Sequence, residues 1–339
     1  SQIAAMIPGA EAYGAHPDVR VAGVGRDTRE PLAGRLFVPL VGERFDGHDF
    51  AGDARRLGAA ATLWQRDRGA PPSGFPAVFV DDTLKALQDL AAAYRRRLGV
   101  KVIGVTGSNG KTSTKDMIHA ALAAAHRVHK TKGNLNNYIG LPLTILEMAE
   151  DAEFAVLEMG MSCTGEIAAL SDIAAPDVAV ITNVGEAHLL QLGSREAIAR
   201  AKFEITAGLG PCGALVWHGD EPLLEALVRE HDGRLPPARI RFGSGHDNDY
   251  YPDDVEISLT GSRFTAVSRG GAIRGLSVPL PGRHNVLNAL AAVAVARLFG
   301  VPDDRIREGL SGMQPTGMRS ETVRAASGAT LINDAYNAS

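Results

Sequence analysis

The sequence has 339 residues, of which 45% are hydrophobic and 22% are charged, so we expect a globular protein of two or three domains. The net charge of −4 argues against bulk nucleic-acid binding, and the two cysteines, Cys163 and Cys212, lack the spacing of a disulfide scaffold or a zinc site. We find no secretory signal and no apolar run that could span a membrane, which predicts a cytoplasmic protein.

Residues 1–81 read as a small α/β domain. Short strands are expected at 36–40, 60–64 and 77–80, with a helical stretch at 53–57. Two polar clusters, Asp27-Thr-Arg29 and residues 42–49, flank the first of these strands. Such clusters are either solvated turns, which the pattern alone favours, or a ligand clamp on loops beside a rigid strand.

Residues 82–313 are expected to form a central domain that opens with a helix at 82–97. Leucines recur at helical spacing along that helix, and Arg95-Arg-Arg97 stands near its end. Cations at a helix C-terminus complement the helix dipole, so this basic run needs no nucleic-acid explanation.

The chain is organised around residues 102–114. The apolar run Val102 to Val105 predicts a buried strand, Thr106-Gly-Ser-Asn-Gly110 is a glycine-rich turn, and a helical pattern begins at Lys111. A strand, a glycine loop and a helix N-terminus together make a phosphate cradle. Lys111 is expected to reach the β- and γ-phosphates, and the Thr112 hydroxyl to bind Mg²⁺.

This loop departs from the general P-loop spacing in one respect. The general pattern places a glycine five residues before Gly110, where this sequence has Val105, so the loop is tighter and starts at Gly107. The alternative is an ordinary glycine turn with Lys111 merely exposed. The strand-loop-helix context favours the phosphate loop.

Further apolar runs at 154–157, 178–181 and 214–217 alternate with helical patterns and predict a mostly parallel sheet. Ligands bind beyond the carboxyl ends of the strands in such sheets. Glu158 follows the first of these runs, where an acid suits Mg-nucleotide chemistry. His188 follows the second, and its chemistry leaves a metal ligand and a polar loop histidine equally open.

Lys202 lies on the apolar face of a helix expected at 194–207. An inward lysine is costly unless it is paired. It could snorkel to solvent, lie near phosphates, or be modified to an anion that binds a metal. The residue pattern does not choose among these.

Three further stretches carry informative patterns. Residues 130–142 carry Asn134, Asn136 and Asn137, which make either a polar-ligand loop or a surface loop with asparagine turns. Residues 255–280 alternate as an antiparallel hairpin or three-stranded patch, and a helix at 282–299 is apolar almost all round and therefore buried. Its early Asn285 and Asn288 could read a base edge.

The expected fold is therefore α/β: a small N-terminal domain, a central P-loop-type sheet that is mostly parallel with an antiparallel patch, and the start of a third, Rossmann-like domain at 314–339. The chain begins at Ser1 without a methionine and stops at Ser339 within a strand-to-loop pattern. We expect that the sequence is part of a longer protein.

Several segments are specific enough to suggest a relationship. They are Thr106-Gly-Ser-Asn-Gly-Lys-Thr112 and the stretches 36–50, 133–142 and 333–339. Together they resemble the Mur ligases, the ATP-dependent amide ligases of peptidoglycan synthesis, over essentially the whole chain. The long matches point to the branch that joins D-Ala-D-Ala to UDP-MurNAc-tripeptide. The resemblance implies an enzyme of cell-wall biogenesis, and so of cell shape and division.

The resemblance also implies roles that the residue pattern left open. Glu158 and His188 match the family's metal ligands, and Lys202 matches a lysine that the family carries as a carbamate, an anion that Mg²⁺ can pair. Two Mg²⁺ sites are expected, with Thr112 also a metal ligand. The residues expected to be catalytic are Lys111, His188, Lys202 and Arg319.

Both substrates gain expected positions from the resemblance. Asn285 and Asn288 match adenine-facing residues, and Asp334 matches an acid near the ATP ribose. The set expected at ATP is Gly107, Ser108, Asn109, Gly110, Lys111, Thr112, Ser113, Asn285, Asn288, Arg319 and Asp334. Asn137 matches a residue at the substrate's diphosphate, and the loops at 27–29 and 42–49 match the uridine-nucleotide site. The set expected at that substrate is Thr28, Arg29, Gly42, Asn134, Asn136 and Asn137.

The implied reaction proceeds through an acyl phosphate made from ATP, which the amine of D-Ala-D-Ala then attacks. The family's third domain closes over the site, so we expect this chain alone to be inactive, and we expect a monomer. Two other functions remain open: a sister ligase that adds an amino acid to a related acceptor or to folate, and a catalytically silent nucleotide-binding module. No Asn-Lys-x-Asp motif of a GTPase is present.

Overall fold

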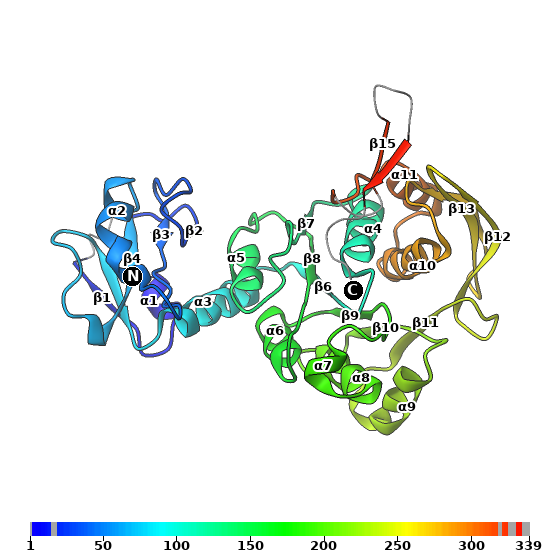
Figure 1. The fold of residues 1–339 in the computed structure, drawn as a ribbon, viewed down its shortest axis with the longest axis horizontal. Coiled ribbons are helices and arrows are strands. Elements are labelled where there is room, and N and C mark those ends of the chain that lie inside the picture. The colour runs from blue at the N-terminus through cyan, green and yellow to red at the C-terminus, as the bar shows by residue number, and fades with distance from the viewer. Residues whose placement is uncertain (1, 15–18, 318–320, 325–329, 334–339) are drawn as a thin grey trace. The chain divides into compact units, whose positions relative to one another are not determined.

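A computed structural model describes residues 2–14, 19–317, 321–324 and 330–333 (Figure 1). Contacts divide the chain into two units, residues 1–99 with 138–148 and residues 100–137 with 149–339. The helix expected to open the central domain belongs to the first unit by its contacts. How these units correspond to the functional domains predicted at 1–81, 82–313 and 314–339 stays a prediction.

The first unit is built on a five-stranded sheet of order β1-β5-β4-β3-β2, in which only the β1–β5 pair is antiparallel. Its strands are β1 (Glu11–Tyr13), β2 (Val24–Gly25), β3 (Leu36–Phe37), β4 (Ala61–Gln65) and β5 (Ala77–Val80). Its helices are α1 (Gln2–Met6), α2 (Ala51–Arg56), α3 (Thr83–Arg97) and α5 (Gly140–Leu146), with 3-10 turns η1 (Gly47–Phe50) and η2 (Arg66–Arg68). The strands predicted in this region are confirmed, although β3 is shorter than expected, because Pro39 has no N–H to donate to a ladder.

Helix α3 begins where its sequence predicts. The carboxylate of Asp82 accepts hydrogen bonds from the backbone N–H groups of Leu84 and Lys85, and so caps the helix. Leu87 and Leu90 are buried in the core that α3 shares with β4, β5 and α5. The arginines at 95–97 form its last turn.

The second unit is built on a sheet of nine described strands in the order β14-β13-β12-β11-β10-β9-β6-β8-β7. The parallel part comprises β6 (Lys101–Thr106), β7 (Val128–Lys130), β8 (Phe154–Glu158), β9 (Val178–Ile181), β10 (Ala214–His218) and β11 (Ala238–Phe242). After β6 the chain forms β7 at the sheet edge and then β8 between β7 and β6. It then crosses to β9, which lies on the other side of β6. The carboxyl end of β6 is therefore the switch point where ligands of such sheets bind.

Helices cover both faces of this sheet (Figure 1). On one face lie α4 (Lys111–Ala123), α10 (Arg283–Leu298) and α11 (Asp303–Ser311), which share one apolar core with the strands. On the other face lie α6 (Glu166–Ala174), α7 (Leu189–Leu192), α8 (Arg195–Phe203) and α9 (Pro222–Glu230). The 3-10 turns η3 (Glu204–Thr206) and η4 (Asp232–Arg234) follow α8 and α9. None of the helices that the structure describes has the length and apolarity needed to cross a membrane.

The antiparallel patch is confirmed as the three strands β12 (Tyr250–Ser258), β13 (Gly261–Ser268) and β14 (Ile273–Val278). Helix α10 is buried on nearly every side, as its composition predicts. The sequence interpretation missed β11, because Ala238-Arg-Ile-Arg-Phe242 alternates with arginines and carries no continuous apolar run. Near the end of the chain, β15 (Glu321–Arg324) and β16 (Thr330–Asn333) pair antiparallel.

Candidate active site

The glycine loop lies between the end of β6 and the start of α4, and two of its residues must be glycines. Gly107 has φ +151° and Gly110 has φ +77°, which side-chain-bearing residues rarely adopt. A Cβ on Gly107 would lie 1.9 Å from Thr182 Oγ1. The loop thus keeps its backbone close to the end of β9, and α4 begins directly after it at Lys111.

Residues at the end of β9 hold this loop in place. The side-chain oxygen of Asn183 accepts from the Asn109 backbone N–H at 3.0 Å, and its amide donates to the Asn109 carbonyl at 2.8 Å. The Thr182 hydroxyl donates to the same carbonyl at 2.6 Å. The sequence analysis gave neither residue a role; their place directly after a strand that pairs with β6 in a parallel sheet is the signal that could have identified them.

Lys111 bends back over the loop. Its ammonium donates to the carbonyl of Gly107 at 2.9 Å and lies 3.3 Å from that of Ser108. A cation held above a glycine loop at a helix N-terminus is the arrangement that binds phosphate. Lys111 therefore lies over the glycine loop, and its contact with the β- and γ-phosphates stays a prediction.

A buried hydroxyl–carboxylate pair joins the loop to β8. Thr112 Oγ1 donates to Glu158 Oε2 at 3.0 Å, and Asn136 Nδ2 donates to Glu158 Oε1 at 2.9 Å. Thr112 and Glu158 are both nearly inaccessible to solvent. The Lys115 ammonium is 4.0 Å from Glu158 Oε2. The predicted metal ligands Thr112 and Glu158 thus lie together, and the predicted substrate residue Asn136 lies beside them.

Lys202 on α8 is 2% exposed, so it does not snorkel to solvent. Among the residues that the structure describes, no carboxylate lies within ion-pair distance of its ammonium. Burial, with a contribution from the nearby charge of Lys111, lowers the pKa of Lys202 to about 7. A lysine with that pKa is partly a neutral amine near neutral pH, and a neutral amine is nucleophilic.

His188 precedes α7 in a left-handed backbone conformation, with φ +70°. Burial lowers its pKa, and the charges of Lys202 and Lys111 lower it further. Because both charges act on His188, the predicted residues His188, Lys202 and Lys111 lie near one another. The lowered pKa also favours the neutral imidazole, which is the form that binds metals.

Two oxygen donors at this site suit a hard cation such as Mg²⁺. Thr112 and Glu158 offer a hydroxyl and a carboxylate, the oxygen ligands that Mg²⁺ prefers. Within the described part of the chain, no group of three or more His, Cys, Asp and Glu side chains is arranged to hold a metal ion.

The first turns of α10 meet the glycine loop. A Cβ on Gly110 would lie 2.8 Å from the Asn288 side-chain oxygen, so this amide lies directly against the loop. Asn288 Nδ2 donates to Asn285 Oδ1 at 3.3 Å, and Asn285 Nδ2 donates to the Pro281 carbonyl at 2.9 Å. Asn288 thus lies against the loop, and Asn285 is bonded to Asn288. Arg319 and Asp334 lie outside the described residues.

The three asparagines of the loop at 130–142 differ in their burial and contacts. Asn136 is half-buried and bonded to Glu158, and its carbonyl accepts from the Gly160 N–H at 2.8 Å. Asn134 and Asn137 are exposed. Asn136 therefore helps to fix the site, whereas its neighbours present polar side chains to solvent.

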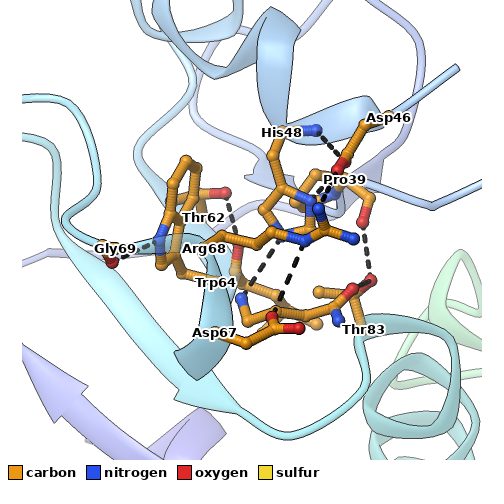
Figure 2. Close-up of polar contacts among 11 residues, drawn as sticks. Pro39, Asp46, His48, Thr62, Trp64, Asp67, Arg68, Gly69 and Thr83 are labelled. Carbon is orange, nitrogen blue, oxygen red and sulfur yellow. Dashed lines mark hydrogen bonds and ion pairs between the residues drawn. The ribbon is translucent and has the colours of Figure 1, made fainter.

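The polar clusters of the first unit are internally bonded. Hydrogen bonds from the side chain and backbone of Arg29 lower the pKa of Asp27 to about 2. In the second cluster, His48 Nδ1 bonds Asp46 Oδ1 at 2.6 Å, and His48 Nε2 accepts from the Gln65 N–H at 3.3 Å. Figure 2 shows Asp46, His48 and Arg68 meeting beside β4.

Further contacts close this second cluster. The His48 ring meets Trp64 edge to face with centroids 4.8 Å apart, and Arg68 Nη1 lies 3.0 Å from Asp46 Oδ2. Partial burial raises the pKa of Asp46, but the hydrogen bonds and charge of His48 and Arg68 outweigh it, so the pKa lies below its usual value. Gly42 and Arg29 are exposed on the two loops, and Thr28 is half-buried. The polar groups thus fix the loop shape, and the exposed residues remain available to a ligand.

Comparison with known proteins gives a consistent match. Residues 105–296 match the family model described as the Mur ligase middle domain, and residues 20–95 match the one described as Mur ligase family, catalytic domain. Over 99% of its length the chain is 50% identical to the UDP-N-acetylmuramoyl-tripeptide–D-alanyl-D-alanine ligase of Bacillus subtilis (strain 168), of which it covers 72%.

Solved structures agree with the sequence match. The crystal structure I of MurF from Acinetobacter baumannii superposes with a TM-score of 0.90 at 31% identity, over 100% of this chain and 73% of that one. The MurF ligase from Thermotoga maritima in complex with ADP superposes with a TM-score of 0.81 at 32% identity, over 96% of this chain and 73% of that one. These structures share the mixed α/β architecture of both units.

Proposed function

The chain belongs to the Mur ligase family, and we propose that it supplies the ATP-binding and substrate-binding parts of a ligase that joins UDP-MurNAc-tripeptide to D-Ala-D-Ala, forming ADP and phosphate. The observation that carries this proposal is the 50% identity over 99% of the chain to a ligase of that name. The glycine loop, with Lys111 above it and Thr112 on Glu158, supports it independently.

The proposed chemistry begins at the γ-phosphate of ATP. A terminal carboxylate oxygen of the tripeptide attacks the γ-phosphorus, the bond to the β,γ-bridging oxygen breaks, and ADP leaves. Carboxylate and phosphate repel each other, so positive charge has to offset both. Lys111 supplies such charge from the loop, and Arg319 is proposed to supply more. The amine of D-Ala-D-Ala then attacks the acyl phosphate, and phosphate leaves as the amide forms.

Magnesium is proposed at two places in this site. Thr112 and Glu158 would hold one ion, and His188 with a modified Lys202 would hold a second. Bound Mg²⁺ supplies charge neutralisation for phosphate and carboxylate oxygens. The buried oxygen donors of Thr112 and Glu158 support the first position.

Lys202 is proposed to be a carbamate in the active protein. The neutral amine attacks CO₂ and loses a proton, which converts a buried lysine that has no carboxylate partner among the described residues into an anion. The lowered pKa of Lys202 and its burial support this step, because a fully protonated amine would not react. His188, which burial and the nearby lysines keep neutral, can share a cation with that anion.

The remaining assignments are proposals of the same kind. Asn285 and Asn288 would lie at adenine, Ser108, Asn109 and Ser113 at the phosphates, and Asp334 near the ribose. The uridine nucleotide would meet the first-unit loops at Thr28, Arg29 and Gly42, and Asn134, Asn136 and Asn137 would meet its diphosphate side. We also propose a cytoplasmic monomer.

A phosphate-release assay on the complete protein tests this function. ATP, Mg²⁺ and UDP-MurNAc-tripeptide are supplied with and without D-Ala-D-Ala. We expect phosphate only when both substrates are present. Release with glutamate or a diamino acid and its matching acceptor, but not with D-Ala-D-Ala, would identify a sister ligase. No release with any pair would leave a nucleotide-binding module.

A further inference from the structure

Helix α4 carries a second polar cluster, one turn beyond the residues that face the nucleotide loop. Lys115 and Asp116 are both almost completely buried, at 0% and 2% exposure. The proposed chemistry uses neither of them. Burying two ionised side chains is costly unless each is well paired, so their partners show what they do.

Asp116 holds three segments of the chain together. One carboxylate oxygen, Oδ1, accepts from the Lys130 ammonium on β7 at 2.7 Å. The other, Oδ2, accepts from both the backbone N–H of Thr316 at 3.0 Å and the Thr316 hydroxyl at 2.7 Å. Burial raises the pKa of Asp116, but the charge of Lys115 and the hydrogen bonds from Lys130 and Thr316 outweigh it and keep the carboxyl ionised.

The Thr316 contact is unusual because of where it lies. Thr316 follows α11 in a segment without regular secondary structure, 200 residues from Asp116 in sequence. A segment of that kind has no ladder to satisfy its backbone groups, so a side chain that accepts its N–H fixes its position. Asp116 therefore fastens this segment to the helix that begins at Lys111.

Lys115 connects this contact to the proposed metal centre. Its ammonium donates to the Thr131 carbonyl at 3.0 Å and lies 3.5 Å from Asp116 Oδ1 and 4.0 Å from Glu158 Oε2. One buried cation thus stands between the carboxylate that bonds Thr112 and the carboxylate that bonds Thr316. A buried site screens charges weakly, so we expect a change in charge around Glu158 to alter the electrostatic potential at Asp116.

We propose that Asp116 is a positioning residue that couples nucleotide binding at the glycine loop to the segment at Thr316. The path runs from Thr112 through Glu158, Lys115 and Asp116 to Thr316. This inference rests on the proposed function, because it requires Mg-nucleotide at Thr112 and Glu158. Three residues beyond Thr316 the sequence reaches Arg319, which is proposed to supply charge at the γ-phosphate and lies outside the described residues.

Hydrogen–deuterium exchange of the complete protein tests the coupling without relying on turnover. Mg²⁺ with a non-hydrolysable ATP analogue is the probe, and exchange is followed in peptides that contain Thr316. We expect the probe to slow exchange there severalfold in the wild type. Thr316→Val keeps the side-chain shape and the backbone N–H but loses the hydroxyl donor, which is one of the two hydrogen bonds from Thr316 to Asp116, so it should reduce this response. Thr316→Ser keeps the hydroxyl and should retain it.

Measuring kcat, analogue affinity and melting temperature of the same variants gives a second test. We expect Thr316→Val to lower kcat about tenfold and the melting temperature by a few degrees, because one hydrogen bond to a carboxylate is lost, while the Kd for the ATP analogue stays near the wild-type value. A response to the analogue that is undiminished in Thr316→Val would overturn the coupling. So would a loss of analogue affinity and melting temperature that matches the loss of kcat, because this pattern describes a purely structural contact.

The two proposals fail in different ways. A wild-type protein whose Thr316 peptides respond to the analogue, but which releases no phosphate with any substrate pair, would keep the coupling and remove the ligase function. A wild-type protein that releases phosphate normally, but whose Thr316 peptides do not respond, would keep the function and remove the coupling.

Discussion

The polar loops of the first unit and the nucleotide loop of the second unit satisfy their polar groups in different ways. In the first unit, His48 bonds Asp46 through one ring nitrogen and the Gln65 N–H through the other. In the second, Lys111 donates to carbonyls of its own loop, and Lys202 is buried without a carboxylate partner among the described residues.

This difference separates residues that hold a shape from residues that meet a charged ligand. A closed network such as the one around His48 is complete without a ligand, so its main effect is to fix the loop. A buried lysine without a carboxylate partner carries a cost that a ligand or a modification can remove. The comparison therefore predicts large chemical effects at the nucleotide loop and smaller, positional effects in the first unit.

The largest effect is expected at Lys202. Lys202→Ala should lower kcat of the complete protein at least about 100-fold, because it removes the group proposed to become the anion at the second metal. The variant should still bind an ATP analogue, since Lys111 and Thr112 are intact. Steady-state kinetics with an analogue titration measure both. Unchanged turnover in a folded Lys202→Ala protein would remove this residue from the mechanism.

Gly107→Ala should follow, with a loss of ATP affinity of about 100-fold. The added Cβ would come within 1.9 Å of Thr182 Oγ1 at a backbone angle that alanine rarely adopts, so the loop has to move. Gly99→Ala is the matched control, because a Cβ there meets nothing within 4 Å. Calorimetric titration with an ATP analogue measures the affinity. Equal affinities in the two variants would contradict the role of the tight loop.

A stability change of a few degrees is expected from Lys202→Met in buffer without CO₂. The unmodified lysine has a pKa of about 7 when folded, against 10.5 ordinarily, so between these values the unfolded chain binds more protons and wild-type stability rises with pH. Methionine lacks this dependence. The variant should therefore melt higher than the wild type below pH 7, and the difference should fade toward pH 10.5. Thermal melts across this range that show a constant difference would argue against a buried, depressed lysine.

The smallest effect on chemistry is expected at His48. His48→Phe keeps the ring beside Trp64 but loses both hydrogen bonds, which should cost about 1–3 kcal/mol of stability. KM for the uridine-nucleotide substrate should rise severalfold while kcat stays unchanged. Glu43→Gln, an exposed change in the same loop, is the control. A fall in kcat of His48→Phe without a change in KM would place this cluster in the chemistry instead.

Local patterns predicted much of this site. The glycine loop, Lys111 and Thr112 are contiguous in sequence, and Glu158 directly follows an apolar strand, so a strand-end rule is enough to find them. Lys202 was recognised as inward by its helical position, and its burial confirms that interpretation. The short strand β7 at the sheet edge was missed because three residues carry too little periodicity to register.

The contacts that hold the site together could not be predicted in the same way. Asn183 bonds Asn109 of the glycine loop, which is 74 positions away in sequence. Asp116 bonds Thr316, which is 200 positions away. Their residue types suit a turn or a solvated helix face equally well, and only the strand order brings the partners together. Patterns along the chain therefore locate the groups that are expected to meet a ligand, whereas the fold selects the groups that position them.

Transfer of ¹⁸O tests the central claim most directly. The complete protein is supplied with ATP, Mg²⁺, D-Ala-D-Ala and a UDP-MurNAc-tripeptide whose terminal carboxylate carries ¹⁸O, and the released phosphate is analysed by mass spectrometry. If the carboxylate attacks the γ-phosphate to form an acyl phosphate, each phosphate released with the amide carries one ¹⁸O from the tripeptide. Phosphate without ¹⁸O, released together with the amide product, would contradict the acyl-phosphate mechanism proposed for this site.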